Sequence, residues 1–114
     1  MSQSAAMLQY RTILQQKDLE GVPGKEVIMF RTDIAPASAL GGHYHSGVEM
    51  FYVAEGTLMF ESEGQSSVSL KAGESWYSPA KLIHNVKNAS TTKPVTLIGF
   101  WVGEKGQPLV TQVK

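Results

Sequence analysis

The chain has 114 residues, with ten basic and ten acidic side chains and a formal net charge of zero. This length suits one domain with a single hydrophobic core. The charge balance argues against a nucleic-acid-binding protein, which normally carries a basic excess. The chain contains no cysteine, which excludes disulfides, thiolate metal sites and a cysteine nucleophile.

The first ten residues, MSQSAAMLQY, lack the basic and apolar regions of a signal peptide. No stretch of the sequence is long and apolar enough to span a membrane. We therefore expect a flexible tail over residues 1–10, one domain over residues 11–114, and a cytoplasmic protein that binds neither membranes nor nucleic acid. An exported form with a removed leader stays an open alternative.

From residue 11 onward, short extended runs alternate with turns that contain glycine or proline. The expected strands are residues 11–15, 25–34, 42–46, 49–56, 57–62, 67–71, 74–78, 84–88 and 95–103. No segment sustains a helical period of apolar residues. Many short strands at regular spacing favour an all-β sandwich or barrel.

The expected strand at 49–56 is apolar on both faces. Alternation places Glu49, Phe51 and Val53 on one side and Met50, Tyr52 and Ala54 on the other. A strand with one wet face should instead alternate apolar and polar residues. We expect this strand to be covered twice, once by the interior and once by another sheet or subunit.

The stretch HYHSGVE holds two of the three histidines of the chain. His43 and His45 lie two apart on an extended segment and so share a face, while Tyr44 points away. Glu49 follows an SGV break, which suits a turn into the neighbouring strand that returns the carboxylate to the imidazoles. This stretch alone fits a metal half-site and a solvated polar edge equally well.

A second stretch, GESWYSPAKLIHNVKN, carries the third histidine. Together the two stretches resemble the two motifs of the cupin superfamily, G-x5-H-x-H-x(3,4)-E-x6-G and G-x5-P-x-G-x2-H-x3-N. The matching positions are His43, His45, Glu49, Gly56, Gly73, Pro79, His84 and Asn88. The resemblance implies a cupin-type barrel, that is, a double-stranded β-helix or jelly roll.

Two positions depart from the motifs, because Ala37 and Lys81 stand where glycine is expected. Neither departure removes a ligand. At Lys81 the left-handed backbone that glycine normally adopts would cost a non-glycine residue roughly 1–2 kcal/mol. Either the turn takes another shape or the loop tolerates the strain.

The resemblance further implies one divalent metal bound by His43, His45, Glu49 and His84. Three nitrogens and one oxygen suit iron, manganese, nickel, copper or zinc. On an octahedral ion, four protein ligands would leave two positions for water, dioxygen or a bidentate substrate such as a diol, enol or oxo-acid, with the metal as Lewis acid and template.

Other residues could contribute to a substrate pocket, although ordinary roles are favoured for most of them. The pocket candidates, for which the core is the alternative, are Trp76, Tyr77, Phe51, Met59, Phe60 and Phe100. Asn88 suits a turn or strand end better than a functional role. Lys81 could attract an anion, but a solvated lysine is favoured. Pro79 restricts the loop before His84.

The leading functional prediction is a small metalloenzyme of the oxygenase type, a dioxygenase-like oxidoreductase that acts on a small organic substrate. The alternatives are a binding module for a small molecule or metal and a non-redox isomerase or decarboxylase, since the fold hosts many activities. The two-sided strand and the apolar run at 96–103 also predict a homodimer.

Overall fold

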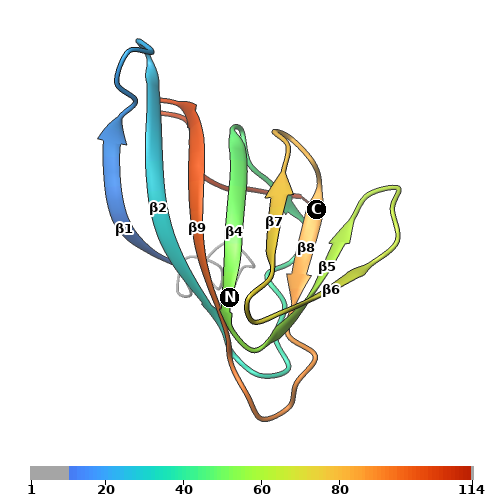
Figure 1. Cartoon of the computed structure of the whole chain (residues 1–114). Coiled ribbons are helices and arrows are strands. Elements are labelled where there is room, and N and C mark those ends of the chain that lie inside the picture. The colour runs from blue at the N-terminus through green and yellow to red at the C-terminus, as the bar shows by residue number, and fades with distance from the viewer. Residues whose placement is uncertain (1–10, 114) are drawn as a thin grey trace.

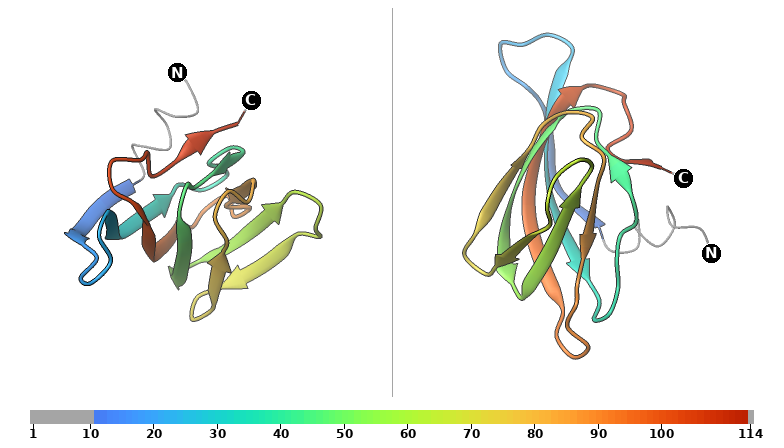
Figure 2. Two further views of the ribbon diagram at one scale, coloured as in Figure 1. Left: turned by 90° about the horizontal axis from the view of Figure 1, so that it is seen from above. Right: turned by 90° about the vertical axis from the view of Figure 1, so that its right-hand side faces the viewer.

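The computed structural model describes residues 11–113, and the elements of this part of the chain are all strands (Figure 1). They are β1 (Arg11–Asp18), β2 (Lys25–Ile34), β3 (His43–Tyr44), β4 (Val48–Glu55), β5 (Thr57–Ser62), β6 (Val68–Lys71), β7 (Ser75–Ser78), β8 (His84–Lys87), β9 (Val95–Glu104) and β10 (Thr111–Gln112). They form two five-stranded antiparallel sheets, in the orders β1-β2-β9-β4-β7 and β10-β3-β8-β5-β6. Figure 2 shows the two sheets as layers that enclose a common interior. The predicted all-β, double-stranded β-helix is confirmed.

The hydrophobic core lies between the sheets, because alternate residues of the long strands face inward. In β2, every second residue from Glu26 to Ile34 is buried. Phe30 of β2 and Phe51 of β4 flank Gly99 of β9 in the strand register. A Cβ atom at Gly99 would lie 2.4 Å from Phe30 Cζ, so glycine at this position leaves the space that the phenyl ring fills.

The faces of β4 follow the predicted alternation. Glu49, Phe51 and Val53 are buried between the sheets, whereas Met50 and Tyr52 are 55% and 51% exposed on the outer face. Half of the two-sided prediction is thus confirmed. Within the described residues of the single chain, no other sheet covers the outer face of β4, where Met50 and Tyr52 lie.

The strands differ from the sequence prediction in three respects: the length of one strand, the presence of another, and the pairing of β4. β1 runs on to Asp18, and β10 was not predicted. More important for the site, β4 does not pair with β3, because the two strands belong to opposite sheets. The SGV break therefore carries the chain across the barrel, and Glu49 approaches the histidines from the facing wall.

Two further expectations concern the ends of the domain and the membrane. The predicted tail over residues 1–10 lies outside the described residues, and the single domain over 11–114 stays a prediction. Within residues 11–113 no helix could cross a membrane.

Asn88 is a structural residue, as favoured from the sequence. Its buried amide nitrogen donates to the carbonyl oxygens of Ile34, Ala35 and Lys93 at 3.1, 3.2 and 2.8 Å. Its amide oxygen accepts from the backbone nitrogen of Ser90 at 3.1 Å. One side chain thus ties together the loops that follow β2 and β8.

The two positions where the family motifs expect glycine adopt left-handed backbone. Ala37 and Lys81 have φ angles of 56° and 66°, and they are the non-glycine residues with positive φ in the described part of the chain. The loop at Lys81 therefore tolerates the strain. The backbone nitrogen of Lys81 donates to the carbonyl oxygen of His45 at 2.8 Å, so the strained turn connects the loop before His84 to the other histidine segment.

Relief of this strain should stabilise the protein. We expect Lys81→Gly to raise the free energy of unfolding by up to about 1 kcal/mol, because the left-handed cost of roughly 1–2 kcal/mol disappears while the unfolded chain gains some entropy. Ala80→Gly is the matched control next to it, at ordinary φ, and should lower stability by about 0.5–1 kcal/mol. Urea denaturation measures both. Equal destabilisation by the two glycines would show that the turn is not strained.

Candidate metal centre

The three histidines of the chain meet in the interior, close to one face of the second sheet. His43 of β3 pairs in register with His84 of β8, and His45 follows directly after β3. All three are buried, and one ring nitrogen from each lies within 4.8 Å of the others. His43 and His45 therefore converge as predicted, and His84 joins them in the space between the two sheets.

Backbone carbonyls determine the tautomer of every imidazole in this cluster. Nδ1 of His43 lies 2.7 Å from the Gly41 oxygen, and Nδ1 of His84 lies 2.8 Å from the Leu82 oxygen. Nδ1 of His45 lies 2.8 Å from the oxygen of Leu109. A carbonyl oxygen can only accept, so each Nδ1 carries the proton. Each neutral ring then offers the lone pair of Nε2, the form that binds a metal.

Glu49 completes the cluster from the opposite sheet. Its Oε2 atom lies 2.9 Å from Nε2 of His45, and both side chains are buried. Neither of these two atoms makes a hydrogen bond. Because Nδ1 of His45 holds the ring proton, two lone pairs face each other at this short distance. Such a pair is stable only with a proton or a cation between or beside the two atoms.

Burial keeps two of the three imidazoles uncharged. Burial, reinforced by the charge of His84, lowers the pKa of His43 to about 3. Burial also lowers the pKa of His84, although its bond to Leu82 works against the shift. Burial by itself would raise the pKa of Glu49, but His45 and Arg11 outweigh it and lower that pKa. The cluster thus contains two neutral imidazoles, those of His43 and His84, beside a carboxylate.

This donor set fits a metal ion. Neutral imidazole nitrogen and carboxylate oxygen suit first-row divalent transition metals. The carbonyl oxygens behind the three rings are the outer partners that orient histidine ligands in metalloproteins. The two unpartnered acceptors of His45 and Glu49 are the observation that a bound cation would explain.

Aromatic side chains cover the cluster on one side. The ring of Phe60 stacks on His84, with centroids 5.0 Å apart and an interplanar angle of 18°. Trp76 packs against Phe60 at 5.2 Å, and Phe51 lies 6.0 Å from Phe60. These three pocket candidates line the interior, and Phe51 and Phe60 are also part of the hydrophobic core.

The other pocket candidates point away from the site. Tyr77 and Phe100 are 56% and 45% exposed on the outer face, because they alternate with the inward residues Trp76 and Trp101. Met59 alternates with the buried Leu58 and Phe60 in β5 and faces outward too. Neither the pocket nor the core, which was the favoured alternative, holds for these three residues, since alternation within β7, β9 and β5 turns their side chains outward. Lys81 is exposed, as favoured from the sequence.

Two contributors were not found from the sequence. Leu109, which holds His45, lies in the segment before the unpredicted β10, and only its backbone participates, so its side chain carries no signal. Arg11 appeared only as the start of a strand. In the structure its charge acts on Glu49 and His84.

Comparisons with known proteins agree with this architecture. The family model described as Cupin domain matches residues 30–103. The structure of the DMSP lyase DddQ from Ruegeria pomeroyi DSS-3 superposes with a TM-score of 0.74 at 16% identity, over 96% of this chain and 54% of that one. A cupin-like protein from Thermotoga maritima gives 0.68 at 19% identity, over 90% and 74%. Oxalate oxidase in complex with glycolate gives 0.69 at 22% identity, over 99% and 59%.

These likenesses establish the fold, and the chain spans only a little over half of the lyase and oxidase structures. No curated protein sequence matches the chain. The family match covers most of the chain and includes every histidine of the cluster as well as Glu49. The chain belongs to the cupin family.

Proposed function

We propose that His43, His45, Glu49 and His84 bind one divalent transition metal and that the protein is an oxygenase-type enzyme for a small organic substrate. The observation that carries the proposal is the unsatisfied pair of His45 Nε2 and Glu49 Oε2, 2.9 Å apart and buried. The three proton-bearing Nδ1 atoms support it, since they leave three Nε2 atoms free as ligands.

Iron, manganese, nickel or copper at these ligands would supply redox chemistry with dioxygen, whereas zinc would restrict the site to Lewis-acid chemistry. The residues of the chain have separate tasks. The Gly41, Leu82 and Leu109 carbonyls orient the imidazoles. Phe60 and Trp76 exclude water from the side of His84.

The known structures of similar fold support a small-molecule substrate. One is an oxalate oxidase with the substrate analogue glycolate and another is a DMSP lyase. A barrel interior lined by apolar rings and a few polar groups is also the usual form of a small-molecule site. A non-enzymatic binding module or a non-redox isomerase or decarboxylase would share these features, so the deciding experiment must measure the reaction.

Oxygen consumption tests the proposal directly. Metal-free protein is loaded separately with ferrous iron, manganese, nickel, copper and zinc, and an oxygen electrode follows a panel of enediols and catechols. We expect uptake with at least one redox-active metal and none with zinc. Glu49→Gln should reduce the uptake, because the neutral amide is a poorer ligand and removes one negative charge. If uptake never exceeds that of Glu49→Gln while calorimetry still shows ligand binding, the protein is a binding module.

Metal content is the control for that assay. His84→Ala should lose most of the bound metal, because it removes one of three imidazole donors. Tyr44→Ala should retain it, since Tyr44 alternates with His43 and points off the ligand face. Elemental analysis of the dialysed proteins gives both numbers. Equal metal content in the two variants would contradict the ligand assignment.

The buried histidines also predict how acid affects the metal-free protein. His43 has a pKa of about 3 in the folded state, whereas in the unfolded chain it titrates near ~6.5. Below ~6.5 the unfolded state therefore binds the extra proton, and the stability present above that pH is lost progressively as the pH falls. The lowered pKa of His84 acts in the same direction.

We expect the free energy of unfolding of metal-free protein to fall between pH 6 and 5, by about 1.4 kcal/mol per pH unit for each histidine that stays neutral. Urea titrations at several pH values measure the slope. His43→Asn should make the slope shallower, because asparagine does not titrate. A flat profile between pH 6 and 5 would show that these histidines are not buried in the neutral form.

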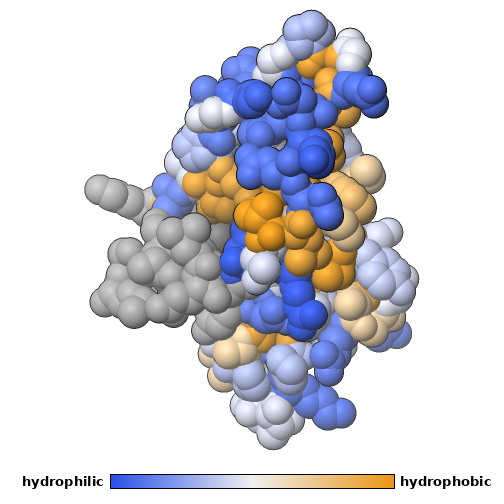
Figure 3. All heavy atoms as spheres, turned by 90° about the vertical axis from the view of Figure 1, so that its left-hand side faces the viewer, coloured by the Kyte–Doolittle hydropathy of each residue, from blue (hydrophilic) through white to orange (hydrophobic). Residues whose placement is uncertain are grey.

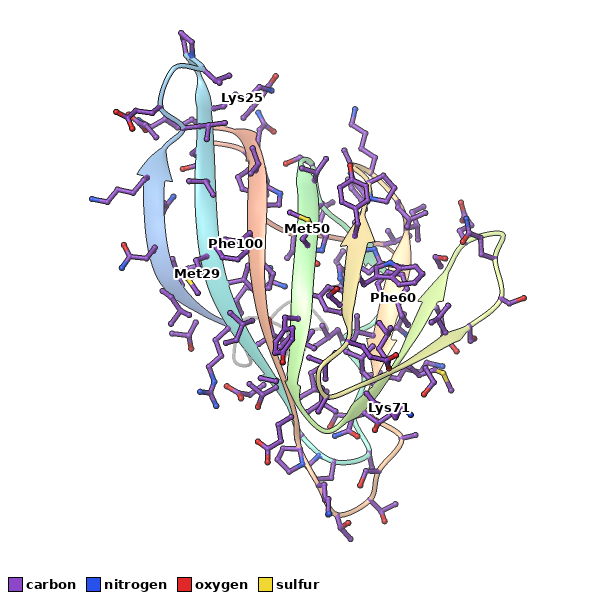
Figure 4. All side chains as sticks on the ribbon, viewed as in Figure 1. Lys25, Met29, Met50, Phe60, Lys71 and Phe100 are labelled. Carbon is purple, nitrogen blue, oxygen red and sulfur yellow. The ribbon has the colours of Figure 1, made fainter. Side chains whose placement is uncertain are left out.

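Assembly is the second part of the proposal, and its evidence is an apolar row on the outer face of the first sheet. The row consists of Met29, Phe100, Met50 and Tyr77, which are register neighbours across β2, β9, β4 and β7. Figure 4 labels Met29, Phe100 and Met50 on three adjacent strands. Seen from the side of β1, hydrophobic residues gather across the middle of the molecule (Figure 3).

We propose that a second copy of the chain covers this row and forms a homodimer. Contiguous exposed apolar surface marks an interaction site, and a two-fold contact lets the same face serve both partners. Phe100→Lys should shift the protein to monomer in sedimentation analysis at micromolar concentration. Val22→Lys, in the exposed loop between β1 and β2, is the control and should leave the association unchanged. A wild-type protein that sediments as a monomer would refute the dimer.

A further inference from the structure

Arg11 is a partly buried arginine at the edge of the barrel, and its shielded Nη1 atom has no hydrogen-bond partner. It is the partly buried residue of β1, whose other residues are all exposed. Nη1 is shielded from solvent and makes no hydrogen bond. A buried guanidinium is costly unless its donors are satisfied, and a native structure normally supplies a partner for each of them.

The strand register directs this side chain into the interior. Arg11 lies opposite Thr32 in the antiparallel pair of β1 and β2, so the two side chains share a face of the sheet. Thr32 is 1% exposed, which makes that face the inner one. The guanidinium carbon lies 4.5 Å from the centroid of the buried Phe30 ring. Stacking on the ring covers one face of the guanidinium and leaves its in-plane N–H donors available.

Further unsatisfied donors lie on the same inner face. Thr32 Oγ1 and Trp101 Nε1 are buried and make no hydrogen bond. Trp101 packs against Phe30 in one core cluster, and it is the register neighbour of Glu49. Arginine and tryptophan side chains can only donate. The unpartnered donors of Arg11 and Trp101 therefore make no hydrogen bond on this wall, and an oxygen-rich anion would supply acceptors for them.

Glu49 itself does not provide those acceptors. The charge of Arg11 is felt at Glu49, but the salt bridges within residues 11–113 include no Arg11–Glu49 contact; Glu49 pairs instead with His45. The guanidinium is near enough to influence the cluster and still has a free donor. It is therefore placed to hold one end of a molecule whose other end reaches the metal ligands.

We propose that Arg11 binds the carboxylate of the substrate, so that the substrate is a small organic acid with a second oxygen function directed at the metal. This inference rests on the metal site proposed above and narrows its substrate class. A planar guanidinium matches a carboxylate in shape and in charge. The hydroxyl of Thr32 and the indole N–H of Trp101 lie on the wall that such an acid would contact.

Binding of matched acids and amides tests the inference without turnover. The zinc-loaded protein is titrated calorimetrically with glycolate, 3-hydroxypropionate and 4-hydroxybutyrate, and with the corresponding hydroxy amides, which are neutral. We expect one acid of the series to bind best and at least about tenfold more tightly than its amide, as a charge-assisted hydrogen bond allows. The preferred length measures the spacing between Arg11 and the metal.

Arg11→Gln should weaken the preferred acid by about tenfold or more and change the amide less than twofold. Arg31→Gln is the matched control, because Arg31 is the other arginine of the chain, is exposed, and pairs with Asp33 at 2.9 Å; it should bind like wild type. If Arg11→Gln does not fold, Arg11→Met is measured by the same criteria, since it keeps an apolar stem over Phe30.

Three results would overturn the inference. They are equal binding of acid and amide by the wild type, equal weakening of both by the Arg11 variant, and loss of zinc from that variant, which would make Arg11 a counter-ion of Glu49. The outcome of the oxygen-consumption assay is independent of these binding measurements. If acid binding depends on Arg11 but no oxygen is consumed, only the proposed oxygenase activity is refuted. If oxygen is consumed with neutral substrates and acids are not preferred, only the proposed role of Arg11 is refuted.

Discussion

The structure depends on burying three imidazoles and a carboxylate inside a small β-barrel without leaving them charged and alone. An ion moved from water into a protein interior loses several kcal/mol of solvation unless partners replace the water. Here the Nδ1–H group of each histidine donates a hydrogen bond to a main-chain carbonyl oxygen. That bond determines the tautomer of the ring and holds its orientation, while burial keeps His43 and His84 neutral. The same contact thus serves stability and ligand geometry, which is why the loops that carry Gly41, Leu82 and Leu109 have to be placed accurately.

The way the chain crosses between the sheets follows from this requirement. His43 belongs to the second sheet, His45 follows its strand, and Glu49 belongs to the first sheet, so the short connection at residues 45–47 must pass from wall to wall. Gly47 permits this passage, because a Cβ atom there would lie 2.2 Å from the Val102 carbonyl oxygen. On the other side, the left-handed turn at Lys81 bonds to the His45 carbonyl and aligns the loop before His84. The backbone strain at Lys81 therefore lies at the point where the two motif segments are joined.

Much of the fold could be predicted from the sequence, because period-two alternation and glycine- or proline-containing turns are local signals. They located nine of the strands and the inward face of β4, and the motif spacing located all four members of the cluster. The predictions that failed concern contacts between segments far apart in the sequence. Pairing of β4 with β9 and β7 instead of β3 is decided by the packing of whole sheets. Tyr77 and Phe100 were misplaced because an aromatic residue suits either face of a sheet, and only the register shows which side it takes. Leu109 acts through its backbone, which no side-chain pattern reveals.

Arg11 shows why the site extends beyond the motifs. The cluster occupies the second sheet and the near strand of the first, but β1 and β2 contribute the remaining wall, and neither strand carries a motif residue. The charge of Arg11 helps to keep Glu49 ionised, but the attraction offsets only part of the cost of desolvating the guanidinium, whose pKa is lowered by burial despite Glu49. An acceptor at the unpartnered Nη1 would offset more of that cost. The unpartnered Nη1 of Arg11, the unsatisfied Thr32 hydroxyl and the indole N–H of Trp101 are each unfavourable in isolation. Their presence on one face next to Glu49 is what a preformed anion site requires, because donors that are ordered before binding lose little freedom when the ligand is bound.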